Sequence, residues 1–127
     1  MGIEEKIRKI LKSEKKVAFA YIFGSFIYNK NSNDIDLAIY VTGKIERNFE
    51  EKVALKLERE TGKEFDVFII NDKPTLFLSE VFKGKLIFSR NEKLRIKFET
   101  EKIPEILDYN ELMKEYDKKR FERYGIR

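Results

Sequence analysis

Residues 17–41 of the chain read VAFAYIFGSFIYNKNSNDIDLAIYV and predict two β-strands joined by a short helix and a turn. Residues 17–23 are apolar, rich in aromatic side chains and followed by Gly24, which predicts a buried β-strand. Residues 35–41 (IDLAIYV) predict a second strand, closed by Thr42 and Gly43. Between the two strands, Gly24 leads into a short helix that Ser25 can cap, and residues 29–33 (NKNSN) predict a turn.

The segments on either side of this stretch alternate between helix and strand. Apolar residues at helical spacing predict a helix over 3–14 and another over 46–61, which Gly62 ends as C-cap. Residues 64–70 (EFDVFII) predict a third strand, Pro74 suits the first turn of a helix to about residue 82, and residues 85–88 predict a short edge strand. We expect the apolar side of helix 46–61 to consist of Phe49, Val53, Leu55 and Leu57.

The remaining residues, 90–124, are charged and mostly helical by pattern. Pro104 is expected to break this segment or to start a new helix, and a strand over 93–98 is the alternative reading. One face beyond the proline gathers Ile106, Tyr109, Met113 and Tyr116. The whole pattern predicts an α/β or α+β fold with helices against a sheet. We expect a single domain over 1–127, with a core of about 1–90 and a helical tail of about 91–127.

The charge balance is mildly basic, with 27 basic and 23 acidic residues and a net charge of +4. The signs are interspersed, so composition does not predict direct nucleic-acid binding. The basic residues near the C-terminus are most simply a solvated helix end, and contact with RNA or an acidic protein surface is the alternative. These residues are Lys114, Lys118, Lys119, Arg120, Arg123 and Arg127.

The chain contains neither cysteine nor histidine. Disulfides, thiol catalysis, cysteine-based zinc sites and imidazole chemistry are therefore excluded. Any metal must bind carboxylate and carbonyl oxygens, which favours Mg²⁺ or Mn²⁺, and we expect a general base to be Asp or Glu. No apolar run is long enough for a signal sequence or a membrane span, which predicts a cytoplasmic protein without membrane contact.

Three aspartates are the candidate catalytic and metal-binding residues. Asp34 and Asp36 stand two apart at the start of a strand, so their side chains point to the same face. Two carboxylates so close repel each other unless a cation lies between them. Asp66 is the acid of the third strand, and it would join the pair if the two strands are neighbours. Three acids can hold two metal ions, one for an attacking oxygen and one for a leaving phosphate.

Gly24 and Ser25 are the candidate nucleotide-binding residues, at a turn from strand to helix. Glycine permits a tight backbone and the close approach of a ligand, and the serine hydroxyl can donate a hydrogen bond to a phosphate. A lone Gly-Ser pair is otherwise an ordinary helix cap, and its value here lies in its position shortly before Asp34.

The motif of Gly-Ser followed at a short interval by Asp-x-Asp, in residues 23–37 (FGSFIYNKNSNDIDL), resembles the signature of the nucleotidyltransferase superfamily. Asp66 is placed like the third acid of that family. The chain length, residues 81–88 (VFKGKLIF) and the helical tail further resemble the minimal nucleotidyltransferase (MNT) antitoxins, which are paired with HEPN-domain toxins. The likeness covers the whole chain, although only the Gly-Ser and acidic positions are specific.

The resemblance implies a mixed sheet with flanking helices and a metal-dependent enzyme. Asp34 and Asp36 would bind two Mg²⁺ or Mn²⁺ ions, Asp66 would bind one and help to activate the acceptor hydroxyl, and Gly24 and Ser25 would hold triphosphate oxygens. In the antitoxin branch the reaction is transfer of AMP from ATP to a tyrosine of the HEPN toxin, an RNase that is thereby silenced. The toxin is thus the expected partner, and a homo- or hetero-oligomer is compatible with the sequence.

The sequence departs from this family pattern at two points. Asn29 stands where many members have a glycine four residues after the serine, and asparagine tolerates left-handed backbone. The interval from Ser25 to Asp34 is also shorter than is common. Two other functions therefore stay open: a non-catalytic antitoxin that neutralises its toxin by binding, and a nucleotidyltransferase that acts on RNA or a small molecule.

Overall fold

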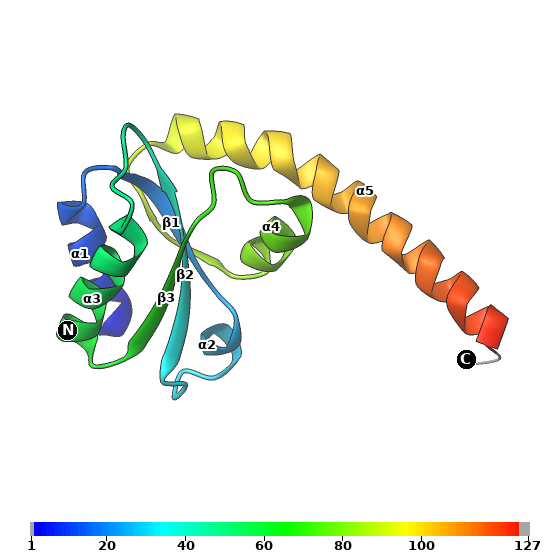
Figure 1. Cartoon of the computed structure of the whole chain (residues 1–127), viewed down its shortest axis with the longest axis horizontal. Coiled ribbons are helices and arrows are strands. Elements are labelled where there is room, and N and C mark those ends of the chain that lie inside the picture. The colour runs from blue at the N-terminus through cyan, green and yellow to red at the C-terminus, as the bar shows by residue number, and fades with distance from the viewer. Residues whose placement is uncertain (1, 125–127) are drawn as a thin grey trace.

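The computed structural model describes residues 2–124. Its centre is a sheet of four strands, β1 (Val17–Phe23), β2 (Asp34–Val41), β3 (Glu64–Ile69) and β4 (Lys85–Ser89). The strand order is β3-β2-β1-β4 (Figure 1). β2 and β3 run parallel, whereas β1 is antiparallel to both β2 and β4. The expected α/β fold with a mixed sheet is confirmed.

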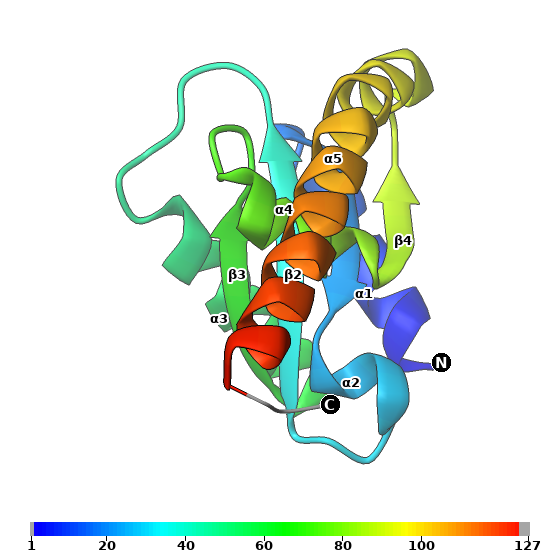
Figure 2. The ribbon, with the colours of Figure 1, turned by 90° about the vertical axis from the view of Figure 1, so that its right-hand side faces the viewer.

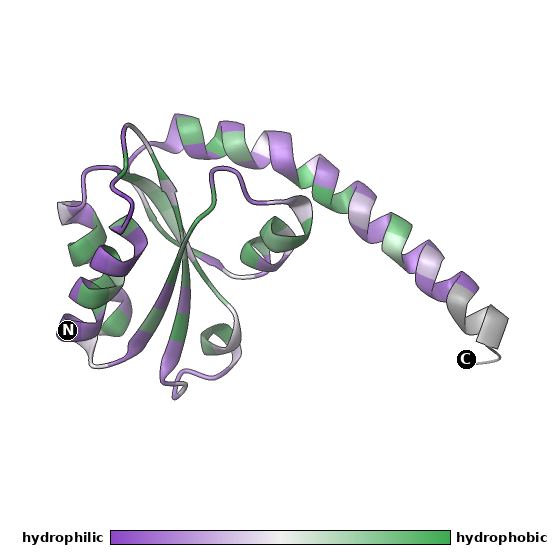
Figure 3. Cartoon of the chain, viewed as in Figure 1, coloured by the Kyte–Doolittle hydropathy of each residue, from purple (hydrophilic) through white to green (hydrophobic). Residues whose placement is uncertain are grey.

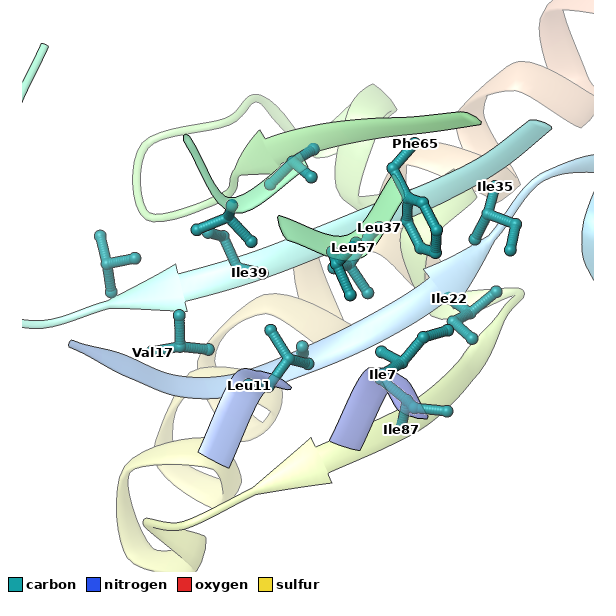
Figure 4. Packing of buried hydrophobic residues seen from close by; sticks show 14 of the residues in the cluster. Ile7, Leu11, Val17, Ile22, Ile35, Leu37, Ile39, Leu57, Phe65 and Ile87 are labelled. Carbon is teal, nitrogen blue, oxygen red and sulfur yellow. The ribbon is translucent and has the colours of Figure 1, made fainter. Parts of the chain in front are cut away.

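Helices cover both faces of this sheet, which is why the central strand β1 is buried along its whole length. α1 (Ile3–Ser13) and α3 (Phe49–Thr61) pack against each other and against one face. We call the apolar layer beneath them the first core (Figure 4); it includes Ile7, Leu11, Ile35, Leu37, Ile39, Leu57 and Phe65.

The opposite face is covered by α4 (Thr75–Phe82) and by the first half of α5 (Glu92–Tyr124) (Figure 2). The layer beneath them, the second core, is largely aromatic; it includes Phe19, Tyr21, Phe23, Leu78, Phe98 and Ile106. Because β2 alternates its side chains, Ile35, Leu37 and Ile39 enter the first core while Ala38 faces the second. The even-numbered residues of β2 therefore share the face of α4 and α5.

α5 is one continuous helix of 33 residues, so the expectation that Pro104 breaks or starts a helix is wrong, as is the alternative of a strand over 93–98. Pro104 and Thr100 are both exposed, so water can satisfy the carbonyl that the proline leaves without a donor. Phe98 and Ile106 are buried in the second core on either side of the proline and hold the helix on the sheet.

The C-terminal part of α5, orange to red in Figure 1, projects away from the body of the molecule. In Figure 3 this part of α5 still carries hydrophobic as well as hydrophilic residues. Tyr109 and Met113 are half-buried and Tyr116 is exposed. Arg127 lies outside the described residues, as do the side chains of Arg120 and Arg123. No helix within residues 2–124 has both the length and the apolar character needed to cross a membrane.

Four local expectations are corrected. The helix expected over 46–61 begins at Phe49, and Leu55 is exposed because only every third or fourth residue of α3 reaches the first core. Ser25 does not cap α2 (Ser25–Tyr28); it is the first helical residue, with Gly24 as N-cap. Asn29 ends α2 with a φ of −138°, which is ordinary extended backbone, so this position does not need a glycine. Gly62, as expected, ends α3 in the left-handed conformation.

Candidate active site

Asp36 and Asp66 lie side by side on neighbouring strands. They are direct register partners in the parallel pair β2–β3. Their flanking pairs, Ile35 with Phe65 and Leu37 with Val67, point into the first core, so both carboxylates project from the opposite face. The structure thus brings together two acids that lie 30 positions apart in the chain.

A second pair of acids lies on the same two strands, two residues before the first pair. Asp34 is the register partner of Glu64, so their two carboxyl groups lie next to each other. The neighbouring carboxyl group of Asp34 raises the pKa of Glu64. Sequence reasoning missed Glu64, although its position two residues before Asp66 was a usable signal, since the same spacing identified Asp34 beside Asp36.

Gly24 closes the site on the β1 side. Asp36 pairs with Phe23 at the end of β1, so the next residue passes directly over the carboxylate. Gly24 has φ 78° and ψ −156°, a region that is open to glycine alone. A Cβ at this position would lie 2.2 Å from Asp36 Oδ2. The contact of backbone with carboxylate therefore requires a glycine at position 24.

The electrostatics of the site are those of crowded anions. The pKa of Asp36 is raised, first by burial and then by the negative charges of Asp66 and Asp34. Asp34 and Asp66 themselves are exposed. A cation placed among the three would relieve the repulsion that Asp36 experiences.

The hydroxyls of Ser25 and Ser32 meet beside these acids, with 3.3 Å between the two Oγ atoms. Ser32 Oγ also lies 3.2 Å from the carbonyl oxygen of Asp34, to which it donates. The Lys63 ammonium donates to the Ser32 carbonyl at 2.8 Å. Sequence reasoning missed both Ser32 and Lys63; Ser32 stood inside a turn cluster, and nothing in the sequence placed Lys63 against it.

Asp34 and Asp66, but not Asp36, line a hollow at the edge of the sheet. This hollow of about 360 Å³ opens at the start of β3. It is lined by Asp34, Glu58, Gly62, Lys63, Glu64, Phe65 and Asp66. A smaller hollow of about 220 Å³ lies between α3 and β3, and Phe65 and Asp66 line it as well as the first. An acceptor group can therefore approach Asp66 from this edge.

The donor chemistry of the site fits a hard divalent cation, because Mg²⁺ prefers carboxylate oxygens. Within the part of the chain that the structure describes, no three acidic side chains are gathered closely enough to hold an ion as they stand. Binding would require the exposed Asp34 and Asp66 to turn toward Asp36. Nothing buries these two side chains in their present orientation, so the movement is open to them.

The family model described as "Polymerase beta, Nucleotidyltransferase" matches residues 5–93. This chain belongs to that family. The matched part of the nucleotidyltransferase contains Gly24, Ser25 and the three aspartates, and the resemblance that the Gly-Ser and Asp-x-Asp spacing indicated is confirmed at the level of the family.

Solved structures show the same fold over nearly the full length of this nucleotidyltransferase. One is the complex of a tri-AMPylated Shewanella oneidensis HEPN toxin with an MNT antitoxin, at 22% identity and a TM-score of 0.67, with 96% of each chain covered. Another is a toxin–antitoxin complex with AMP-PNP, at 22% identity and a TM-score of 0.68, covering 95% of this chain and 98% of the other. A third, the MntA–HepT toxin–antitoxin complex, has 22% identity and a TM-score of 0.65, with 96% and 97% covered. No match was found among curated proteins.

Proposed function

We propose that this nucleotidyltransferase is the antitoxin of a toxin–antitoxin pair and transfers AMP from ATP to a tyrosine of a cognate HEPN RNase toxin. The observation that carries the proposal is the pairing of Asp36 with Asp66 directly beneath the Gly24 backbone. The proposal is supported by the family and by the likeness to chains of complexes that hold an AMPylated toxin or AMP-PNP.

The side chains of Asp34, Asp36 and Asp66 would hold divalent ions, Mg²⁺ or Mn²⁺. When bound, such ions neutralise the triphosphate and the charge that develops as pyrophosphate leaves. Because Gly24 has no side chain of its own, its backbone can be approached closely by a phosphate as well as by the Asp36 carboxylate that lies against it. Ser25 donates its hydroxyl to a phosphate oxygen and so fixes the direction of the triphosphate.

In the transfer, the phenolic oxygen of the acceptor tyrosine forms a bond to the α-phosphorus of ATP. The bond from that phosphorus to the bridging oxygen of the β-phosphate breaks, and pyrophosphate leaves in line with the incoming oxygen. Asp66 accepts the phenolic proton, a role that suits its position at the hollow along β3. Holding the two reactants in this alignment supplies much of the rate acceleration.

A protein acceptor can bring part of its own recognition surface to Asp66 at the edge of the sheet, which a small molecule cannot do. We further propose that the reaction takes place in the cytoplasm, where ATP is available as the nucleotide donor.

The test is transfer of label from α-labelled ATP to the purified cognate toxin in the presence of Mg²⁺. We expect label on a toxin tyrosine with the wild-type chain and none with the variant Asp34→Ala plus Asp36→Ala. Asp72→Ala, in the exposed turn after β3, is the matched control and should transfer label normally. Label transfer by the double variant would refute the proposal, and label that appears on RNA without any toxin would replace it with an RNA-directed activity.

A further inference from the structure

The apolar face of α5 continues beyond the body of the molecule. Phe98 and Ile106 hold the first half of the helix against the second core. On the same face, Tyr109, Met113 and Tyr116 follow at steps of three and four residues, in the part of the helix that projects away in Figure 1. Apolar residues repeated at these steps are typical of the contact line between two paired helices.

Leu112 borders these residues, and we call Tyr109, Leu112, Met113 and Tyr116 together the seam. Leu112 is 63% exposed and Tyr116 is 57% exposed. Single exposed apolar residues are common on protein surfaces, whereas several on one face of a projecting helix indicate an interface. The seam therefore offers a surface along which a second helix can lie.

The charges on the two sides of Leu112 complement each other. Residues 101–111 contain four acids and one lysine, whereas residues 113–119 contain three lysines and two acids. Glu105 and Lys119, both exposed, lie seven residues before and seven residues after Leu112. Seven residues are close to two helical turns, so these three side chains share one side of α5. The projecting part of the helix is thus complementary in charge to its own reverse.

We propose that the seam binds the seam of a second copy of this chain, with the two helices antiparallel and Leu112 at the centre of the contact. Leu112 then meets Leu112 of the second copy, and Glu105 lies opposite Lys119 of the second copy. A parallel pair would place Glu105 opposite Glu105 and Lys119 opposite Lys119, and the repulsion of like charges disfavours it. The inference is independent of the proposed function, because the seam contains none of the candidate site residues.

The proposed contact is short, and its length sets the expected affinity. The helix from Glu105 to Lys119 is roughly 20 Å long, at about 1.5 Å of rise per residue. Two helices of this length bury an area at the low end of specific protein interfaces. We therefore expect a reversible dimer with a dissociation constant on the order of 10 to 300 µM.

The experiment is sedimentation velocity of the full chain at concentrations from about 5 µM to about 500 µM, where the wild type should shift from monomer to dimer. Leu112→Glu places two carboxylates at the centre of the contact and should remain monomeric throughout. Leu107→Glu is the matched control and should dimerise like the wild type. Leu107 belongs to the same helix and is 61% exposed, but it lies on the side opposite to the seam.

A charge exchange tests the antiparallel arrangement. Glu105→Lys and Lys119→Glu should each weaken dimerisation about threefold or more, because each places like charges opposite each other. An equimolar mixture of the two variants should associate at least as well as the wild type, since each lysine then faces a glutamate. Glu111→Lys, which makes the same charge change on the side away from the seam, is the control and should leave dimerisation unchanged.

Thermal melting checks that all variants are folded. A wild type that stays monomeric at the highest concentration would overturn the inference, and so would Leu107→Glu that is as monomeric as Leu112→Glu. A mixture of Glu105→Lys and Lys119→Glu that associates no better than either variant alone would overturn the antiparallel pairing. If the wild type is monomeric and Leu112→Glu fails to bind the cognate toxin, the seam belongs to the toxin interface, which also overturns pairing between two copies.

Discussion

Gly24 and Asp36 are in direct contact: a Cβ on residue 24 would lie 2.2 Å from Asp36 Oδ2. The glycine follows the last residue of β1, and the aspartate lies near the start of β2, so the contact is fixed by the register of the two antiparallel strands. The contact places a backbone turn without a side chain over the partly buried carboxylate of Asp36. A phosphate bound at the turn and a cation bound at the carboxylate would therefore lie next to each other.

Gly24→Ala is expected to abolish AMP transfer and to lower the free energy of unfolding by about 1 to 3 kcal/mol, because residue 24 has a backbone conformation closed to alanine. Chemical denaturation and label transfer measure the two effects. Gly43→Ala is the matched control, since Gly43 has a φ of 79° but a Cβ added there would meet nothing within 4 Å. It should lose stability and keep its activity; normal transfer by Gly24→Ala would contradict the required contact.

Asp36→Asn should stabilise the metal-free protein at neutral pH. The pKa of Asp36 is raised in the folded state, so its charged form is less stable there than in the unfolded chain. The penalty is absent below the ordinary pKa of Asp and develops as pH rises through the raised value. Melting curves from about pH 4 to about pH 8 should therefore show a gain for Asp36→Asn that grows with pH, on the order of 1 kcal/mol or less.

In the presence of Mg²⁺ the wild type should become more stable than Asp36→Asn, because Mg²⁺ is expected to raise the melting temperature of the wild type and not that of the variant. If Asp36→Asn were less stable than the metal-free wild type at neutral pH, the surroundings of Asp36 would have to stabilise its charged carboxylate. That result would contradict the repulsion on which the cation site depends.

Tyr21 anchors α5 to the sheet. Its hydroxyl donates to Glu99 Oε1 at 3.1 Å, and burial together with the charge of Glu99 raises the pKa of Tyr21 well above its usual value. Tyr21→Phe should lower the free energy of unfolding by about 1 kcal/mol, measured by chemical denaturation. Tyr28→Phe changes an 82% exposed side chain and should have no effect. Equal stability of the two variants would show that this hydrogen bond is not a link between β1 and α5.

Arg90 ties the end of α1 to the sheet. Its guanidinium donates to the carbonyls of Leu11 at 2.7 Å and Val17 at 2.8 Å, and it also reaches those of Lys12 and Glu14. Arg90→Met leaves helix-end carbonyls without this donor and should cost about 2 kcal/mol of stability in a denaturant titration. Arg59→Met, at an exposed position of α3, should cost almost nothing. A loss for Arg59→Met as large as that for Arg90→Met would refute this role.

The elements of the sheet could be predicted from the sequence because each strand is a short apolar run next to a turn signal. The pairing of the strands could not be predicted in the same way. Only the structure places β3 parallel to β2, because nothing in the sequence of residues 64–69 indicates which strand they pair with. The continuity of α5 through Pro104 was also beyond local rules. It depends on tertiary anchors, Phe98 and Ile106, that lie in a core the sequence does not reveal.

The residues of the candidate site likewise divide into those that the sequence could identify and those that only the structure identifies. Asp34, Asp36 and Asp66 could be selected by spacing and by family resemblance, and their roles remain predictions. Ser32 and Lys63 could not be selected, because they are joined by a contact between two connecting segments that lie 31 residues apart in the chain. Glu64 could have been found by applying the alternation of side chains to β3 as well as to β2.

Asp36 and Asp66 are predicted to bind a common divalent cation, and a titration with Mn²⁺ followed by electron paramagnetic resonance measures this binding. We predict saturable Mn²⁺ binding by the wild type and by Asp72→Asn, and binding at least about tenfold weaker by both Asp36→Asn and Asp66→Asn. Unchanged Mn²⁺ affinity in either of the two site variants would contradict this prediction.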